Sequence, residues 1–370
     1  MAEPNVTLTA LRRAIAKELE MPFFKRYKNG FLDADAGGST DSVIDSALTQ
    51  KDKFWNGAWV YRVASQEASL ITNFTTQNNK LVLEVPVTTF ADGDDYEIHN
   101  IWNAYDIHEA INQTIRDSRR IFFETITDET LIIEENKLAY VLSGLAKTPH
   151  IIHKVWLEQP ASVKRGSVTG ATSNSVFVEN AGVLSGVTSS WKFSIYAGLG
   201  TGQIRSVSGV GGNEAGITPN WTTVPDATSK YALWNPTEQI QDWRPWHALR
   251  YDSTKEFPDL LYFSRRPIDF QGLRIRLEYS ALPAELSAEA DTTVIPISYI
   301  VPAAISKLHS RKVKDTKVDR ELHFAESKRY AEMAEAWMLR NAPHRPDSNI
   351  LDQAYTGYQP STSDPLNWGE

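Results

Sequence analysis

Two similar β-rich segments, one on each side of a helical pattern, constrain this sequence more than any other feature. The first contains "STDSVIDSALTQKDKFWNGAWVYRV" and "LVLEVPVTTFADGDDYEI", and the second contains "ATSNSVFVENAGVLSGVTSSWKFSIYAG" and "TTVPDATSKYALW". Both carry β-branched and aromatic residues at a period near two, which favours strands. The two segments match strand by strand: each has an aromatic strand, near Trp59 or Trp191, then an Ile-x-x-hydrophobic strand, at Ile71 or Ile204, and last a Tyr-x-hydrophobic strand, at Tyr96 or Tyr231. The sequence therefore predicts two copies of one small β-barrel or sandwich-like module.

Helical patterns lie before, between and after these segments. Residues 7–20 predict an amphipathic helix with an apolar stripe and with Arg12 placed elsewhere around it. A second helix is predicted to start in a capping box at Asp106, with Ile107, Ala110, Ile111 and Ile115 as its buried stripe. From about Ser298 to the end of "AEMAEAWML" the pattern is helical again. The fold class expected is α+β.

Composition excludes several kinds of chemistry. The chain has 370 residues and no cysteine, so disulfides, thiolate metal sites and cysteine nucleophiles are excluded. The net charge of -8 argues against a general nucleic-acid binder that relies on phosphate neutralisation. No apolar run approaches the roughly twenty residues of a membrane span. We expect an acidic protein without a membrane segment or an export signal.

The stretch "SIYAGLGTGQIRSVSG" has three glycines close together, at Gly198, Gly200 and Gly202. Their spacing is G-x-G-x-G, no Lys-Ser/Thr follows, and no helix is predicted to begin there. A phosphate site draws on both of those features. The first β segment has "ASQEAS" at the corresponding place, without glycine. The stretch is therefore predicted to be a hairpin tip.

Candidate catalytic and metal-binding patterns are incomplete. "HEAIN" from His108 has Asn112 where a zincin helix needs its second histidine, and "DADAGGSTDS" begins like a calcium loop at Asp33 and Asp35 but lacks the later ligands. We therefore assign no catalytic, metal or cofactor residue. Two alternatives remain open: a glycoside hydrolase that uses the acidic cluster Asp92, Asp94, Asp95 and Glu97, and a glycan- or host-recognising tail protein with lectin-like modules that bind through Trp191, Trp221 or Trp243.

Several motifs resemble those of the head-to-tail connector (adaptor, or neck) proteins of tailed bacteriophages. A helix with an Ile-Asn pair precedes a Thr-Asp-x-Thr strand and a Tyr-x-Leu strand, and a Y-x-x-x-P strand end precedes a Pro-x-x-Tyr helix start. In this chain they are Ile111–Asn112, Thr127–Thr130, Tyr140–Leu142, Tyr279–Pro283 and Pro296–Tyr299. The resemblance covers most of residues 38–312. Its motifs are structural patterns rather than catalytic signatures.

The resemblance implies a non-enzymatic virion protein, made in the host cytoplasm and located at the head–tail junction. It implies a ring, usually of twelve copies, that contacts the portal protein, a tail-side neck, terminator or tail-tube protein, and packaged DNA without sequence-specific binding. C-terminal arms reach the portal or a neighbouring subunit in such rings. In this chain the interface residues of the arm would be Leu351, Tyr355, Tyr358, Leu366 and Trp368. Basic residues that face the channel or a partner would be Arg311, Lys312, Lys314 and Lys317.

These patterns together give an expected domain organisation. We expect a helical connector core with strands, two added β modules and an extended C-terminal arm. The expected boundaries are 1–34 for an N-terminal helix and loop, 35–100 for β module 1, 101–165 for connector core, 166–236 for β module 2, 237–340 for connector core, and 341–370 for the arm. The added modules make the chain longer than a minimal adaptor.

Overall fold

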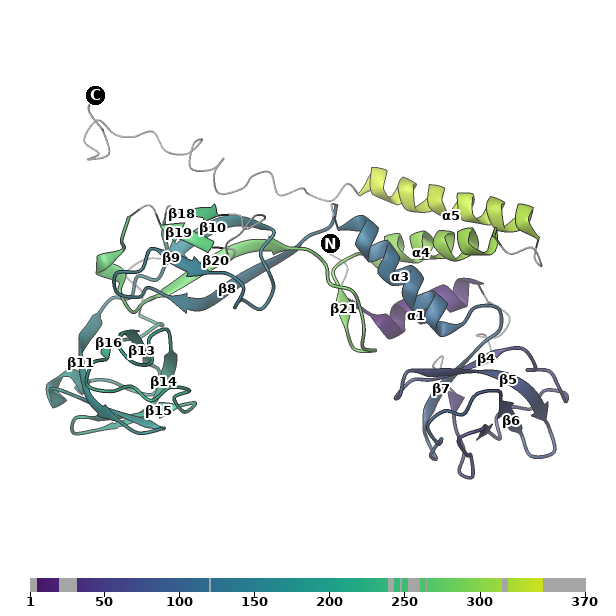
Figure 1. Cartoon of the computed structure of the whole chain (residues 1–370), viewed down its shortest axis with the longest axis horizontal. Helices are drawn as coiled ribbons and strands as arrows, with labels where there is room; N and C mark the ends of the chain where they lie inside the picture. Colours follow the sequence, from purple (N-terminus) through teal and green to yellow (C-terminus); the bar gives the residue numbers. More distant parts are fainter. Residues whose placement is uncertain are drawn as a thin grey trace. The chain divides into compact units, whose positions relative to one another are not determined.

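The chain is a mixed α+β protein in which strands predominate, so the expected helical core is corrected to a mostly β architecture (Figure 1). The computed structural model describes residues 5–19, 32–119, 121–238, 243–246, 248–251, 260–263, 265–314 and 319–341. Within these residues the chain forms two compact units. The first joins the residues up to Phe123 to those from Pro283 onward, and the second is Glu124–Leu282. The segments predicted as connector core contribute helices to the first unit and strands to the second.

The first unit holds all α-helices of the described residues, together with a two-stranded sheet. They are α1 (Leu8–Leu19), α3 (Ala104–Ser118), α4 (Ile297–Lys312) and α5 (Arg320–Arg340), with β1 (Val6–Thr7) paired to β21 (Thr292–Thr293). One apolar core gathers residues from all four helices. α4 and α5 run antiparallel, since Ser306 donates to the Ser327 carbonyl at 2.8 Å and His309 meets His323 nearer the turn (Figure 1). No described helix is both long enough and apolar enough to span a bilayer.

The helices agree with the predicted stripes but differ in two details. Ile107, Ile111 and Ile115 of α3 are fully buried, which confirms that stripe. The N-cap of α3 is Asn103, whose side chain accepts a hydrogen bond from the Tyr105 amide, so the predicted capping box at Asp106 is wrong. Arg12 lies within the buried stripe of α1 rather than outside it.

The first unit also contains β module 1, an antiparallel sheet of six strands in the order β2-β7-β4-β5-β6-β3. Its strands are β2 (Leu32–Asp33), β3 (Ser42–Ile44), β4 (Trp59–Arg62), β5 (Glu67–Thr75), β6 (Lys80–Leu83) and β7 (Asp95–His99). The sheet wraps around its own apolar core, which includes Val60, Phe74 and Tyr96. The ends of β2 and β3 are linked through the Asp35 amide, which donates to the Ile44 carbonyl at 2.7 Å.

The second unit combines β module 2 with two smaller sheets. β module 2 is a closed six-stranded barrel of β11 (Val163–Ala171), β12 (Ser175–Val178), β15 (Glu214–Thr218), β14 (Ile204–Gly211), β13 (Lys192–Ala197) and β16 (Lys230–Trp234), with the 3-10 turn η1 (Ala181–Leu184). The four-stranded sheet is β17 (Arg244–Pro245), β10 (Ile151–Leu157), β20 (Arg274–Ala281) and β8 (Glu124–Ile132). The three-stranded sheet is β18 (Ala248–Tyr251), β19 (Leu260–Phe263) and β9 (Ala139–Val141), and η2 (Ile268–Phe270) precedes β20.

The two β modules have the same strand order and the same connectivity. Read in chain order, β2 to β7 correspond one by one to β11 to β16, and each pair occupies the same place in its sheet. The barrel closes because β11 is long enough to pair with β12, whereas β2 is only 2 residues long. The duplicated module predicted from sequence is therefore confirmed in topology, with one closed copy and one open copy.

Strand registers revise the predicted match of the tryptophans. Trp59 pairs with His99 in β module 1, and Lys192 pairs with Trp234 in the barrel. Because His99 and Trp234 are equivalent strand ends, Trp59 corresponds to Lys192. Trp191 lies one residue earlier, so the predicted match of the two strands is confirmed and their tryptophans are one position out of register.

The registers confirm one further match and revise another. Tyr96 and Tyr231 each lie three residues before the equivalent strand ends and are both buried, as predicted. Ile71 corresponds to Val207 rather than to Ile204. The first residue of β4, Trp59, pairs with Leu70, and the first residue of β13, Lys192, pairs with Ser206. Ile71 and Val207 are the residues that follow these two partners. The predicted match of these two strands is confirmed, with a residue register that differs by three.

The turn before the second strand of each module is also repeated. In β module 1 the Ser39 amide donates to the Ser42 carbonyl at 3.0 Å, and the two hydroxyls lie 2.6 Å apart. In the barrel the Thr172 amide donates to the Ser175 carbonyl at 3.0 Å, and their hydroxyls lie 2.8 Å apart. Serine and threonine side chains stabilise such turns by bonding locally. The matching residues "STDS" and "TSNS" thus have one structural role.

Candidate functional site

The three glycines of the "GLGTG" stretch form the turn of the β13–β14 hairpin, as predicted. Gly198, Gly200 and Gly202 have φ of 79°, 82° and 93°. L side chains rarely adopt such angles, which glycine reaches without steric cost. A Cβ atom at Gly198 would also lie 2.3 Å from the Thr228 carbonyl oxygen. The glycines are therefore explained by backbone geometry, without a phosphate.

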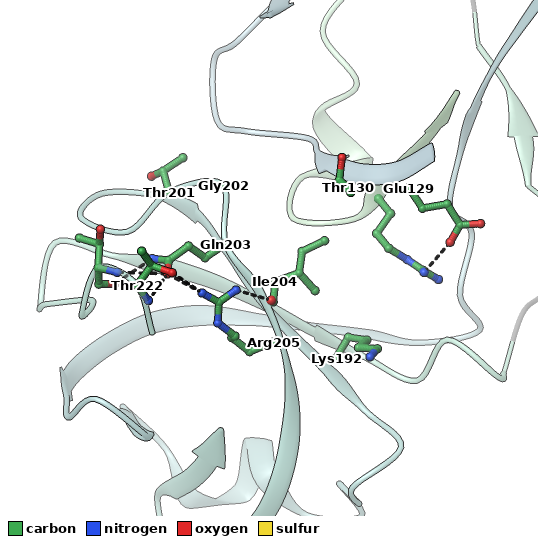
Figure 2. A pocket seen from close by; sticks show the side chains of 11 residues that line it. Glu129, Thr130, Lys192, Thr201, Gly202, Gln203, Ile204, Arg205 and Thr222 are labelled. Atoms are coloured by element: carbon green, nitrogen blue, oxygen red, sulfur yellow. Dashed lines mark hydrogen bonds and ion pairs between the residues drawn. The ribbon is translucent and has the colours of Figure 1, made fainter. Parts of the chain in front are cut away.

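A pocket of about 650 Å³ lies beside this hairpin, within the second unit (Figure 2). Its walls come from β8, from β13 and β14 with their hairpin, from the segment after β15, and from β20. The lining is polar, with Ile204 as its one large aliphatic side chain among the described residues. The residues that line it are Glu129, Thr130, Lys192, Thr201, Gly202, Gln203, Ile204, Arg205, Thr222, Thr223 and Arg274.

Arg205 is held on one side of the pocket by neutral acceptors. Its Nη2 donates to Gln203 Oε1 at 3.0 Å and to Thr222 Oγ1 at 2.9 Å, and its Nε donates to the Asn220 carbonyl at 3.1 Å (Figure 2). Lys192 donates to the Ser206 hydroxyl at 2.8 Å. Neither cation has a carboxylate within ion-pair distance in the described part of the chain. Both therefore keep an uncompensated positive charge.

The one carboxylate of the lining is already neutralised. Glu129 pairs with Arg274 at 2.6 Å (Figure 2). It also pairs with Arg276 at 2.6 Å. Arg274 also pairs with the buried Glu158 at 2.6 Å. The pocket thus presents an excess of positive charge together with threonine hydroxyls. This arrangement suits a ligand that carries carboxylates and hydrogen-bonding groups.

The most buried polar cluster of the described residues lies in the first unit, around Arg12. Its guanidinium donates to both carboxylate oxygens of Glu97, at 2.8 and 3.0 Å, and to Glu289 at 2.7 Å. Its Nη1 lies 2.8 Å from Nε2 of His108, and its Cζ lies 4.4 Å from the centre of the Tyr61 ring. The cluster joins α1, α3, β4, β7 and the segment before β21. Arg12, Glu97 and Tyr61 are buried within it, so its role is to fix β module 1 to the helices.

The charges of this cluster shift the pKa values of its members. Burial lowers the pKa of His108 to about 4, and the adjacent Arg12 charge acts in the same direction. Burial alone would raise the pKa of Glu97, but hydrogen bonds from His99 and Arg12 outweigh it and hold the pKa well below its usual range. His108 is therefore neutral and Glu97 ionised at neutral pH. The sequence held one signal for this cluster: Arg12 follows Leu8 by four residues and precedes Ile15 by three.

The acidic cluster considered for a glycoside hydrolase is divided between different environments. Glu97 is buried in the Arg12 cluster. Asp94 pairs with Arg62 at 2.7 Å and accepts from the Ala91 amide at 2.7 Å, which orders the turn. Asp92 and Asp95 are exposed. The pocket beside the β13–β14 hairpin is lined by none of these four residues.

The tryptophans considered for sugar stacking are packed against protein. Trp191 and Trp221 are 6% and 5% exposed and belong to the barrel core. Trp243 carries the guanidiniums of Arg276 and Arg274 on its ring, at 4.1 and 5.2 Å from the centroid. These contacts do not favour a lectin-like role for the three rings.

The basic residues proposed to face a channel or partner have different surroundings. Arg311 donates to Gln113 at 3.3 Å, and Lys312 lies 5.4 Å from the centre of the Trp102 ring, so both contact their own unit. Lys314 is exposed beyond the end of α4. Lys317 and all five arm residues, Leu351, Tyr355, Tyr358, Leu366 and Trp368, lie outside the described residues.

Metal binding finds no support in the described residues. They contain no group of three or more His, Asp or Glu side chains placed to hold an ion. Asp35 accepts instead from the Ser46 amide at 2.5 Å, and Asp33 lies opposite Asp95 in the β2–β7 pair. Asn112, at the zincin histidine position, is used structurally.

α5 exposes large apolar side chains on both sides of the stripe that it buries. Tyr330 and Ala334 form the stripe against α4, while Leu322, Phe324, Met333 and Leu339 are 54%, 64%, 49% and 80% exposed. At about 100° per residue, Leu322 and Met333 fall on one side of the stripe and Phe324 and Leu339 on the other. Met333 also borders an apolar groove of about 370 Å³ between α1, α4 and α5.

The motifs that resemble phage connectors occupy structural positions. The Asn112 side chain donates to the Leu286 carbonyl and accepts from its amide, both at 2.9 Å. Asp128 accepts from the Thr130 amide and hydroxyl at the β8 bulge, and the Tyr140 hydroxyl accepts from the Glu134 amide. Pro296 caps α4. The chain matches no protein-family model and no curated protein sequence.

Proposed function

We propose that this chain is a structural protein of a tailed-phage virion that forms a ring in the neck, joining the portal to the tail around the DNA channel. The proposal starts from the connector-like motifs of the sequence. The observation that carries it is the double apolar flank of α5. A closed ring of more than two copies uses head-to-tail contacts, so each subunit needs two different surfaces that fit one another.

The two flanks of α5 have the chemistry such contacts need. Exposed apolar residues grouped on a folded surface mark sites of protein association. The flank with Leu322 and Met333 continues into the apolar groove that Ile297, Val301 and Tyr330 line. The flank with Phe324 and Leu339 projects large side chains of the kind that fill such a groove. In the proposed ring, one flank of each copy packs against the opposite flank of the next.

The β modules and the C-terminal arm have separate roles in this proposal. The modules would extend from the ring toward tail-side partners, and residues 341–370 would bind the portal. Deletion of residues 341–370 should then abolish portal binding and leave the fold intact. Unchanged binding to purified portal after this deletion would refute the role of the arm.

Two double variants test ring assembly directly. Leu322→Glu with Met333→Glu blocks one flank, and Phe324→Glu with Leu339→Glu blocks the other. Each variant alone should stay monomeric, because every contact in its ring would contain one blocked flank. An equal mixture of the two should give dimers and no rings, since each dimer retains only blocked flanks at its ends. Native mass spectrometry and negative-stain electron microscopy read out both results.

Immunogold labelling of virions tests the location. Antibody against the β modules should place gold at the head–tail junction. Gold at the distal tail tip would contradict the proposed neck location and favour the host-recognition alternative. Rings from wild-type protein that persist in both double variants would instead show that α5 is not the assembly surface.

A further inference from the structure

We propose that the basic pocket beside the β13–β14 hairpin receives the acidic tip of β module 1, residues 91–95, from a second copy of this chain. The inference rests on the proposed function to the extent that it requires association between copies. It adds a second, electrostatic contact to the apolar one and names its two surfaces. The argument depends on uncompensated charges of opposite sign on the two sides.

The pocket side has an ordered excess of positive charge. Lys192 and Arg205 have only neutral partners, while the single lining carboxylate, Glu129, is shared by two arginines. Arg205 is held by four hydrogen bonds to its neighbours, so its charge stays in place. A cation fixed in this way loses little entropy when an anion binds. The hollow of about 650 Å³ has room for a turn of several residues.

The acidic tip carries charges of the opposite sign. Asp92 and Asp95 are exposed, and Asp33 lies directly opposite Asp95 in the β2–β7 pair. Like charges directly opposite one another destabilise a sheet. Partial desolvation raises the pKa of the otherwise exposed Asp95, and the neighbouring Asp33 charge raises it further, although Arg13 opposes both. Asp33, Asp92 and Asp95 have no ion-pair partner among the described residues.

The acidic tip is ordered before any partner arrives. Asp94 bonds to the Ala91 amide and to Arg62, and the Gly93 amide donates to the Ala34 carbonyl at 2.8 Å. Gly93 has φ of 79°, so the turn depends on a residue that adopts this angle freely. A preordered turn that presents carboxylates fits a preordered basic pocket at low entropic cost.

The pocket and the acidic tip are also different surfaces of one chain. A contact between them is head-to-tail, and it repeats from copy to copy in the way a ring requires. The threonine hydroxyls of the pocket, on Thr201, Thr222 and Thr223, would bond to the backbone of the incoming turn. The acidic tips of two copies would repel each other, so they would not form the contact.

Charge-reversal variants of the full chain test this contact. Lys192→Glu makes the pocket less positive, and Asp92→Lys gives the tip a positive charge. Sedimentation velocity at low ionic strength should show that each variant needs an about tenfold higher concentration than wild type for half-assembly. The difference should shrink at high salt, because exposed charges are screened. Lys192→Gln should raise the concentration for half-assembly by a smaller factor. It tests the same charge if Lys192→Glu fails to fold.

An equal mixture of the two reversed variants is the decisive sample. The reversed pocket of one then faces the reversed tip of the other, and the remaining contact is wild type on both sides. Association of the mixture should therefore return to within about threefold of wild type. Lys51→Glu and Glu84→Lys, at exposed positions of β module 1, are controls with the same changes of charge and should behave as wild type.

Three results would overturn the inference. They are single reversals that assemble as wild type does, a mixture that assembles no better than its components, and a wild-type chain that does not associate at any concentration. Rings that form equally in all these variants would leave the neck proposal intact and remove this contact. Immunogold label away from the neck, together with restored association in the mixture of reversed variants, would refute the neck proposal. It would leave the contact between the pocket and the acidic tip intact.

Discussion

Arg12 on α1 and Glu97 on β7 form a two-pronged ion pair from which water is excluded. The two donor–acceptor distances are 2.8 and 3.0 Å, and the exposed fractions of the side chains are 0% and 1%. Removing one partner of such a pair leaves a buried charge without compensation. The stability of the first unit therefore depends on the contact between its helices and β module 1.

Arg12→Met should destabilise the chain by about 3–5 kcal/mol, because Glu97 and Glu289 both lose their buried partner. Urea denaturation followed by circular dichroism measures the change. Arg116→Met is the matched control. Arg116 also pairs with two glutamates, but it is 37% exposed, so its loss should cost far less than that of Arg12. Equal losses in the two variants would contradict the role given to burial.

His108 should make the chain less stable in mild acid. Its pKa is about 4 in the folded chain against an ordinary value of 6.5, so the unfolded chain binds the proton more readily within that window. Stability is therefore retained above pH 6.5 and falls as pH falls toward 4, by about 2 kcal/mol between pH 7 and pH 5. The loss due to Glu97 begins only below its unfolded pKa of 4.5. Urea denaturation at pH 7 and pH 5 measures the loss of stability due to His108.

The variant His108→Gln isolates this group. Glutamine can still accept a hydrogen bond from Arg12 but has no proton to bind in this range. The variant should lose about 2 kcal/mol less than wild type between pH 7 and pH 5. An unchanged pH dependence would assign the acid sensitivity to other groups, such as His309, whose pKa burial also lowers.

Gly198→Ala should destabilise the barrel by about 2–4 kcal/mol, because the backbone has a positive φ and a new Cβ would meet the Thr228 carbonyl. Gly186→Ala provides the control. Gly186 has a similar φ of 75° but open space around it, so only the conformational cost of about 1 kcal/mol applies. Thermal denaturation compares the two. If both variants cost the same, the close approach at Gly198 is not a constraint.

Asn112→Ala should cost about 1–3 kcal/mol, since the Leu286 amide and carbonyl both lose their partner. Asn112→Asp should cost less, because its carboxylate still accepts from the Leu286 amide. Gln113→Ala, at the next position of α3, is the control and should change stability by less than about 1 kcal/mol. Urea denaturation ranks the three variants, and a reversed ranking would contradict the role of the two hydrogen bonds between Asn112 and Leu286.

The sequence predicted elements better than it predicted contacts between them. The stripe of Ile107, Ile111 and Ile115 and the hairpin at Gly198 were predictable, because periodicity and glycine spacing are local signals. The duplicated module was also visible, since corresponding strands follow one another in the same sequence along the chain in both copies. Its register was not: matching by residue type aligned the tryptophans, whereas the ladder aligns Trp59 with Lys192.

The candidate sites were beyond sequence reasoning for a physical reason. Glu97 and Glu289 are far apart in the chain, and only the fold brings both to Arg12. The pocket likewise collects one or two residues from each of β8, β13, β14 and β20. Spacing rules detect ligands on one helix or loop, so a site of this kind leaves no motif. α5 was predicted as a helix, but which of its apolar residues stay exposed depends on α4.

The equivalent strands β7 and β16 attach their modules by opposite chemistry. Glu97 and His99 of β7 face the Arg12 cluster, whereas Ala232 and Trp234 at the same positions of β16 enter the apolar core of the neighbouring sheet. One copy of the duplicated module is thus attached through ion pairs, and the other is attached through apolar packing. Acid weakens the first and leaves the second almost untouched, while cooling does the reverse. Each module should therefore loosen under a different condition, β module 1 in acid and β module 2 in the cold.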